Sequence, residues 1–125
     1  MIRSREAINV MAADPNRTVY GITTGFGSFA DVSISPDQRR KLQLNLIRSH
    51  AVGVGEPVSL DIVRRMYILR INTLAKGRSG ISPDNLEKVI KAYNADFIPM
   101  VPSQGTVGAS GDLCPLSHLS LGLLG

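Results

Sequence analysis

The chain has 125 residues, 43% of them hydrophobic, and a formal net charge of +4, which suits one globular domain with a modest core. Its basic residues are scattered, with Arg39, Arg40 and Lys41 as the densest run, and its aromatic residues are few. This pattern disfavours nucleic-acid binding. A single cysteine, Cys114, excludes an internal disulfide, and we expect neither a signal peptide nor a membrane span. A cytoplasmic location is therefore predicted.

Helices are predicted along the chain from capping residues and turn signals. A short helix is expected over residues 4–12, followed by a break at 14–16 and an extended segment at 18–20. Three more helices should each begin after a serine that is followed within two residues by aspartate. Such a serine offers an oxygen to free amides, and the carboxylate lies near the positive end of the helix dipole. The three serines are Ser35, Ser59 and Ser82.

Apolar spacing predicts which faces of these helices are buried. The first should end near Ser49, and the second should end at Lys76 before Gly77. The residues expected in the core are Leu42, Leu46 and Ile47 in the first helix, Ile62, Val63, Met66, Leu69 and Leu74 in the second, and Leu86, Val89, Ile90 and Tyr93 in the third.

Proline and glycine interrupt regular structure between residues 97 and 111, and a last helix is expected to begin near Asp112 or Pro115. Its apolar side should carry Leu116, Leu119, Leu123 and Leu124. The predicted fold is therefore mainly α-helical, with irregular loops that hold the chemistry. Because this apolar helix ends where it should meet partners, we expect the chain to be truncated.

The loop from Tyr20 to Gly27 contains three glycines in eight residues. Glycine permits positive φ angles and a close approach of the main chain to a ligand. The loop lacks the lysine of a P-loop and the spacing of a dinucleotide fingerprint, so phosphate binding is not indicated.

The stretch Gly108–Leu113, followed by Pro115–His118, resembles the signature of the aromatic amino acid lyases, the family of the histidine and phenylalanine ammonia-lyases. Residues 20–27, 45–56 and 70–80 resemble the family in the same order, so the resemblance covers nearly the whole chain. It implies a helical, fumarase/aspartase-like fold. Residues 1–125 would then form a partial amino-terminal domain, with the rest of the family's chain absent.

The resemblance implies that Ala109, Ser110 and Gly111 cyclise to 4-methylideneimidazol-5-one (MIO), the family's electrophilic prosthetic group. The Gly111 nitrogen would attack the Ala109 carbonyl carbon, and glycine at this third position removes a crowding β-carbon. Ser110 would lose its hydroxyl as water, so that two waters leave in all. An electrophile is useful because ammonia is a poor leaving group. Taken alone, such a tripeptide is more often a flexible turn.

Two further residues match family positions. Tyr20 matches the tyrosine proposed as the base that removes the β-carbon proton, a role that requires positive local potential; an aromatic anchor of the loop is the alternative. His50 matches the position that faces the substrate side chain, and the Ser49–His50 pair resembles the histidine-specific enzymes. A histidine at a helix end is otherwise a favourable partner of the dipole.

The activity implied is elimination of ammonia from L-histidine to give urocanate, in a homotetramer whose missing part supplies further catalytic residues. We expect the 125 residues to be inactive alone. The alternatives are a phenylalanine or tyrosine lyase, an aminomutase, or a non-catalytic truncated product that binds full-length subunits. His118 is predicted to be structural, and two histidines and one cysteine at distant positions predict no metal site.

Overall fold

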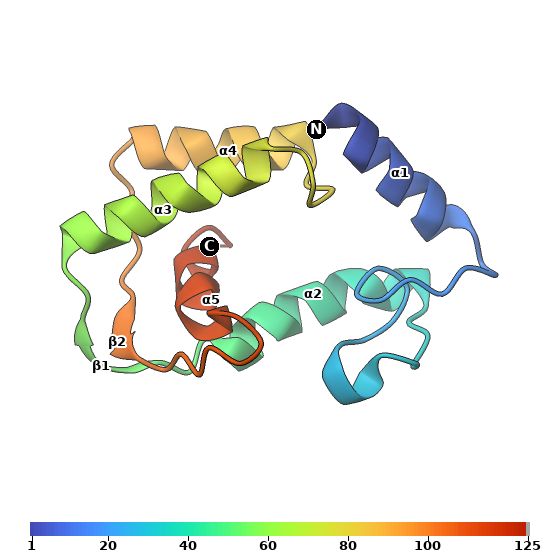
Figure 1. Cartoon of the computed structure of the whole chain (residues 1–125), viewed down its shortest axis with the longest axis horizontal. Helices are drawn as coiled ribbons and strands as arrows, with labels where there is room; N and C mark the ends of the chain where they lie inside the picture. Colours follow the sequence, from blue (N-terminus) through green and yellow to red (C-terminus); the bar gives the residue numbers. More distant parts are fainter. Residues whose placement is uncertain (125) are drawn as a thin grey trace.

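The computed structural model describes residues 1–124, and most of them lie in helices. The elements are α1 (Ile2–Ala13), the short 3-10 helix η1 (Gly27–Phe29), α2 (Pro36–His50), β1 (Val54–Pro57), α3 (Leu60–Ala75), α4 (Pro83–Asn94), β2 (Pro102–Gln104) and α5 (Leu113–Leu121). Figure 1 shows α3 and α4 side by side, with α5 lying between this pair and α2. The mainly α-helical class is confirmed. None of the helices described in residues 1–124 is long and apolar enough to cross a bilayer.

The helices begin where the serines predicted, but only one serine acts as a side-chain cap. The Ser82 hydroxyl oxygen accepts a hydrogen bond from the Asn85 amide at 3.2 Å. Ser35 and Ser59 make no such bond, so the prediction of capping oxygens is wrong for these two. The Ser35 hydroxyl instead hydrogen-bonds the Asp37 carboxylate and lowers its pKa. Pro36 at the first position of α2 supplies the fixed φ that starts the helix.

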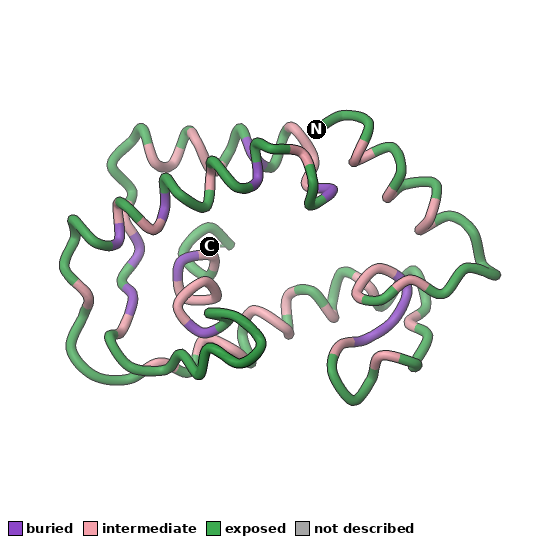
Figure 2. Tube along the Cα trace, viewed as in Figure 1, coloured by how far each residue is buried: buried purple, intermediate pink, exposed green. Residues whose placement is uncertain are grey.

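The core is small and lies where α3, the segment before β2, and α5 meet. Its buried side chains are Val63, Tyr67, Val101 and Leu119. Figure 2 shows these buried segments together, and a separate buried stretch in the loop before η1. Burial of Val63, Leu74 and Leu86 was predicted and is confirmed.

Tyr67 holds α3 against α4, a role that the sequence did not predict. Its hydroxyl donates to the Val89 carbonyl oxygen at 3.3 Å, and its ring meets Tyr93 edge to face with centroids 5.5 Å apart. The side chain is only 1% exposed, and burial raises the pKa of its phenol. At the far end of α4, Arg64 on α3 pairs with Asp96, an exposed contact that adds little stability.

Several predicted core residues are exposed. Ile62 and Leu69 are 51% and 63% exposed, because the core residues of α3 occupy a different face of the helix. Leu123 and Leu124 are also exposed, since α5 ends at Leu121. Apolar spacing identified the helices correctly but overestimated how much of each is covered.

The first helix is held at both ends by hydrogen bonds between side chains and main-chain groups of distant segments. Arg39 on α2 donates to the carbonyl of Ala12 at 2.7 Å and to that of Ile34 at 3.2 Å, which satisfies a free carbonyl at the end of α1. At the other end, Ser4 accepts from the Gly80 amide at 3.1 Å. Residues 18 and 19 lie in no regular element, and a turn begins at Tyr20, where the Val19 amide donates to the Thr23 hydroxyl at 2.8 Å.

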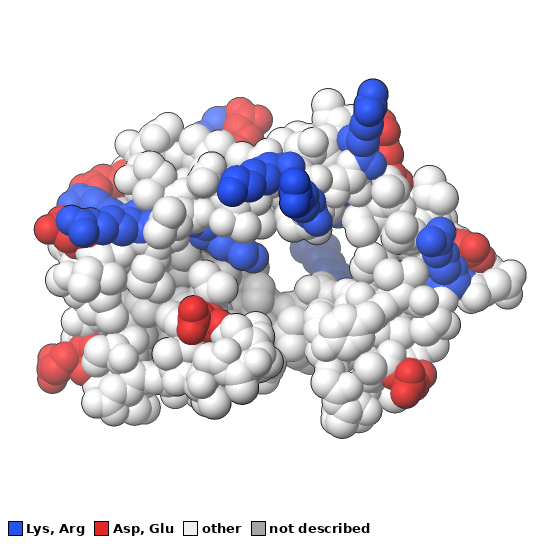
Figure 3. All heavy atoms as spheres, in the orientation of Figure 1, with Lys and Arg blue, Asp and Glu red and all other residues white. Residues whose placement is uncertain are grey.

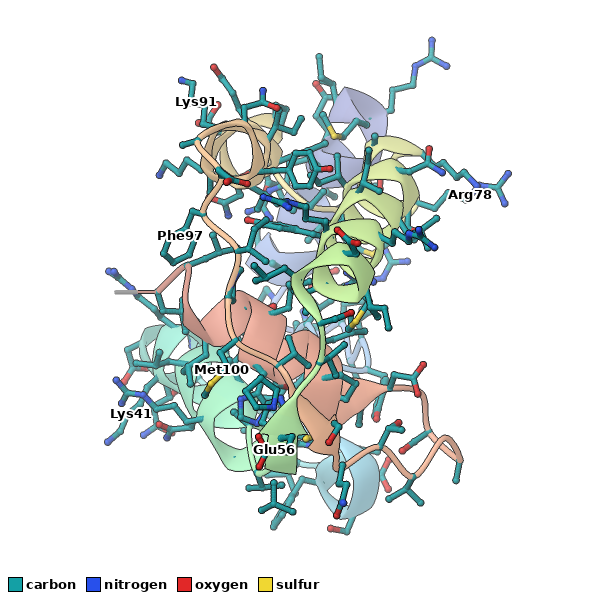
Figure 4. The ribbon with its side chains drawn as sticks, turned by 90° about the vertical axis from the view of Figure 1, so that its left-hand side faces the viewer. Lys41, Glu56, Arg78, Lys91, Phe97 and Met100 are labelled. Atoms are coloured by element: carbon teal, nitrogen blue, oxygen red, sulfur yellow. The ribbon has the colours of Figure 1, made fainter. Side chains whose placement is uncertain are left out.

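Most other charged side chains project into solvent. Figure 3 shows lysine, arginine and acidic side chains spread over one face without a patch of one sign. In Figure 4, Lys41, Arg78 and Lys91 point outward from three different parts of the chain.

A short antiparallel pairing of β1 with β2 anchors the segment that leads into α5. Val54 lies opposite Gln104 and Pro57 opposite Pro102, with an irregularity between the two pairs. Gly55 has a φ of +86° at this irregularity. The Val58 amide continues the pairing with a 2.8 Å bond to the Val101 carbonyl. The exit of α2 is thereby placed beside the loop that precedes α5.

We expect Tyr67→Phe to lower the free energy of unfolding by about 1 kcal/mol, because it leaves the Val89 carbonyl without its buried donor. Denaturant unfolding followed by circular dichroism measures the change. Tyr93→Phe is the matched control, since no hydrogen bond of the Tyr93 hydroxyl is found within residues 1–124. Equal effects of the two variants would contradict a specific role of the Tyr67 hydroxyl.

Candidate active site

Three of the residues singled out in the sequence line one cavity of about 1020 Å³. Tyr20 comes from the glycine-rich loop, His50 from the end of α2, and Ser110 from the loop before α5. The remaining lining residues are Gly25, Phe26, Gly27, Ser28, Phe29, Val32, Ile34, Leu42, Leu46, Ile47, Ser49, Leu113 and Ser117. The wall is therefore largely apolar, with a few hydroxyls and one imidazole, as small-molecule sites usually are.

The glycine-rich loop is compact, and two of its glycines are required by contacts. A β-carbon on Gly21, whose φ is +71°, would lie 2.8 Å from the Phe26 ring, and one on Gly25 would lie 2.7 Å from the Phe29 β-carbon. Beneath them, buried Thr24 accepts from the Gly21 amide at 3.1 Å and donates to the Gly25 carbonyl at 3.0 Å. Glycine thus lets the main chain form a wall of the cavity.

Tyr20 is held in place at both its ring and its hydroxyl. The phenolic oxygen accepts a hydrogen bond from the Gly27 amide at 3.1 Å, and the ring packs edge to face on Phe26 with centroids 5.6 Å apart. The side chain is nevertheless 60% exposed. The Gly27 amide places a partial positive charge against the phenolic oxygen, while the exposure leaves that oxygen accessible from the cavity.

The orientation of His50 follows from its partners. Its Nδ1 lies 2.8 Å from the Leu46 carbonyl oxygen and 3.1 Å from the Ser49 hydroxyl. A carbonyl oxygen can only accept, so Nδ1 carries the proton and Nε2 of the neutral ring carries a lone pair. No hydrogen bond to this Nε2 is found in the part of the chain described. The half-buried ring can therefore accept a hydrogen bond from a molecule in the cavity.

The loop that carries Ser110 is a tight turn closed on itself. The Gly111 amide donates to the Gly108 carbonyl at 3.4 Å, so Ala109 and Ser110 occupy the two central positions. Gly108 and Gly111 have φ angles of +80° and +97°, and no atom lies within 4 Å of an added β-carbon at either. Glycine is required here by backbone conformation rather than by crowding from other elements. Ser110 lines the cavity; Ala109 and Gly111 do not.

A second hydrogen bond joins the two ends of this loop. The Thr106 hydroxyl donates to the Asp112 carboxylate at 2.6 Å, outside the turn. Asp112 precedes α5 but does not cap the helix with its side chain. The Asp112 carboxylate therefore holds the Ser110 loop and does not cap α5.

The sequence missed several residues that line the cavity. Phe26, Phe29 and Ser117 were not proposed as site residues, although Phe26 lies within the noted glycine-rich loop and Ser117 within the signature stretch. Leu42, Leu46 and Ile47 were predicted to be core residues, but they are half-buried and face the cavity. Apolar spacing does not distinguish a core position from the wall of a site.

Other parts of the structure add no further chemical group to this site. A smaller cavity of about 510 Å³ lies between α3, β2 and the start of α5, and buried Cys114 contributes to its wall. Within residues 1–124 no group of three histidine, cysteine, aspartate or glutamate side chains is arranged to hold a metal ion. The cavity that contains Tyr20, His50 and Ser110 is the candidate site.

Comparison with known proteins identifies the family of this chain. The family described as aromatic amino acid lyase matches the chain over residues 1–125. The chain belongs to the aromatic amino acid lyase family. As a member of this family it is similar to histidine ammonia-lyase of Caenorhabditis elegans, with 57% identity over 99% of the chain and 18% of the relative.

Solved structures of similar proteins have the same fold over the part that this chain matches. Histidine ammonia-lyase from Trypanosoma cruzi superimposes with a TM-score of 0.83 at 48% identity, over 96% of this chain and 22% of that one. Phenylalanine aminomutase of Pantoea agglomerans gives a TM-score of 0.88 at 35% identity, over 95% and 22% respectively. This chain therefore spans about a fifth of the length of these relatives.

We expect Thr106→Val to loosen the Ser110 loop, because it removes the hydrogen bond to Asp112 that joins the ends of the loop. Amide hydrogen exchange of residues 107–111 should become about tenfold faster, the effect of losing one hydrogen bond to a charged group. Thr73→Val is the control, since among residues 1–124 the Thr73 hydroxyl is found bonded to the Leu69 carbonyl of the same helix. Unchanged exchange in Thr106→Val would show that the turn is held by other contacts.

Proposed function

We propose that this chain carries part of the active site of a histidine ammonia-lyase, which eliminates ammonia from L-histidine to give urocanate. The observation that carries the proposal is the convergence of Tyr20, His50 and Ser110 on one cavity. Relatives of similar sequence from animals and bacteria are histidine ammonia-lyases, at 50–57% identity. Because the chain covers about a fifth of their length, we assign the activity to the full-length polypeptide and expect these residues to be inactive alone.

The turn at Ala109–Gly111 fits the family's MIO group. Its two central residues are the alanine whose carbonyl oxygen would leave as water and the serine whose hydroxyl would leave as the second water, and the glycine nitrogen lies at the closing position of the turn. Ser110 faces the cavity from this turn. An MIO group formed here would supply an electrophile that makes ammonia a better leaving group. Its formation needs no metal, because the atoms come from Ala109, Ser110 and Gly111.

Tyr20 is proposed to accept the proton from the β-carbon of the substrate. Elimination breaks the bonds from the α-carbon to nitrogen and from the β-carbon to hydrogen, and forms the double bond between the two carbons. The phenolic oxygen is accessible and already bonded by the Gly27 amide, which favours negative charge on that oxygen. The edge-to-face contact with Phe26 keeps the ring from rotating away.

His50 is proposed to bind the imidazole ring of L-histidine. Its Nε2 lone pair can accept from a ring N–H, a donor that the side chain of phenylalanine lacks. Leu46 and Ser49 hold the ring in this tautomer. A site built to hydrogen-bond a substrate donor discriminates against analogues without it.

A phenylalanine- or tyrosine-specific lyase or an aminomutase is the alternative, since solved aminomutases share the fold with TM-scores of 0.86 and 0.88. The fold therefore does not distinguish these reactions, and the proposal of L-histidine as the substrate rests on His50. Assembly as a homotetramer and a cytoplasmic location, the latter suggested by the single cysteine, are part of the same proposal.

Assays of the full-length polypeptide on L-histidine, L-phenylalanine and L-tyrosine test the function. We expect activity on histidine, and His50→Leu should lower kcat/KM for histidine by about 10-fold to 100-fold, the effect of losing one hydrogen bond to substrate. His50→Gln retains an acceptor and should lose less. Preference of the unaltered enzyme for phenylalanine, or an equal loss in both variants, would contradict the assignment.

A further inference from the structure

A hydrogen bond connects the exit of α2 with α5, away from the cavity. Gly53, three residues after His50, donates its amide hydrogen to Nε2 of His118 at 2.9 Å. Because Nε2 accepts, the His118 ring is neutral and its proton resides on Nδ1. Among the hydrogen bonds of residues 1–124, this is the one in which a side chain links residues 50–58 to α5.

The backbone around this bond is packed so closely that side chains are excluded. A β-carbon on Gly53 would lie 3.0 Å from His118 Nε2, 3.1 Å from the Gln104 carbonyl oxygen and 3.1 Å from the Pro102 β-carbon. A β-carbon on Gly105 would lie 2.5 Å from the Cys114 sulfur and 3.0 Å from the Gly53 α-carbon. We call the contact of Gly53 with Gly105 and His118 the glycine junction.

The glycine junction lies between two parts of the candidate site. On one side, Gly53 is joined by two residues to His50; on the other, Gly105 and α5 flank the loop that carries Ser110. A shift of Gly53 away from His118 would therefore move His50 relative to Ser110. The pairing of β1 with β2 holds the same segments but contributes no side-chain hydrogen bond.

We propose that His118 is a positioning residue for substrate binding: by accepting from Gly53, it sets the place of the His50 ring relative to the Ser110 loop. The proposal rests on the proposed function, since it assumes that His50 contacts the substrate. Without an acceptor at this point, the Gly53 amide must turn toward water, and the exit of α2 moves with it. The effect is expected on binding of the amino acid more than on the chemical step.

The test compares three variants of the full-length, assembled enzyme. His118→Gln places an amide oxygen where Nε2 lies; His118→Asn carries the same group on a chain one carbon shorter, which does not reach Gly53; His118→Leu removes the acceptor. We expect His118→Asn and His118→Leu to raise KM for histidine by about tenfold, while kcat falls by less than about threefold. His118→Gln should keep KM within about twofold of the value for the unaltered enzyme. Intact mass should show the same loss of water in all three.

A double variant provides the sharper readout. In a His50→Leu background, His118→Asn should produce little further rise in KM, because the residue that it positions has already been removed. Independent, additive effects would overturn the proposal. So would equal KM values for the Asn and Gln variants, or an Asn variant that does not fold while Gln does, which would make His118 purely structural.

The outcomes separate this proposal from the proposed function. If the unaltered enzyme turns over histidine and the variants differ only in stability, the positioning role fails and the function stands. If the unaltered enzyme does not act on histidine, both fail. If His118→Leu does not fold, the Asn and Gln pair still decides the question, since both carry an amide.

Discussion

The close packing of Gly53 against Gly105 and α5 is the constraint on which the rest of the site depends. Two segments about fifty residues apart in the sequence touch at their main chains there, and a β-carbon on either glycine would separate them. The β1–β2 pairing and the His118 hydrogen bond hold the contact. As a result, the end of α2 and the loop before α5 open onto the same cavity.

Different elements of the chain form the core and the candidate site. α3 contributes Val63 and Tyr67 to the small core, and α4 packs against them; neither helix lines the candidate cavity. The site is built instead from loops and helix ends, where glycines with positive φ allow tight turns. A tyrosine, an imidazole and a serine turn are thereby presented to one largely apolar cavity.

Much of the fold and of the candidate site could be predicted from the sequence, partly from local signals and partly from the family resemblance. Serine, proline and aspartate located the helix starts because these signals are local; whether Ser35 or Ser59 caps its helix depends on rotamers that the sequence does not specify. The β1–β2 pairing was missed because it joins two short, proline-containing segments far apart in the chain. The meeting of Tyr20, His50 and Ser110 was implied by family resemblance, whereas spacing alone would have left Ser110 in an ordinary turn.

The central claim is that the Ser110 turn, presented to this cavity, is chemically altered in the working enzyme. Intact-mass measurement of the full-length, assembled polypeptide tests it most directly, with Ser110→Ala as the reference. We predict a mass lower than the sequence requires by two water molecules, located by peptide mapping to residues 109–111, whereas the Ser110→Ala reference should have the full mass of its own sequence. An active enzyme with the full, unmodified mass would contradict it.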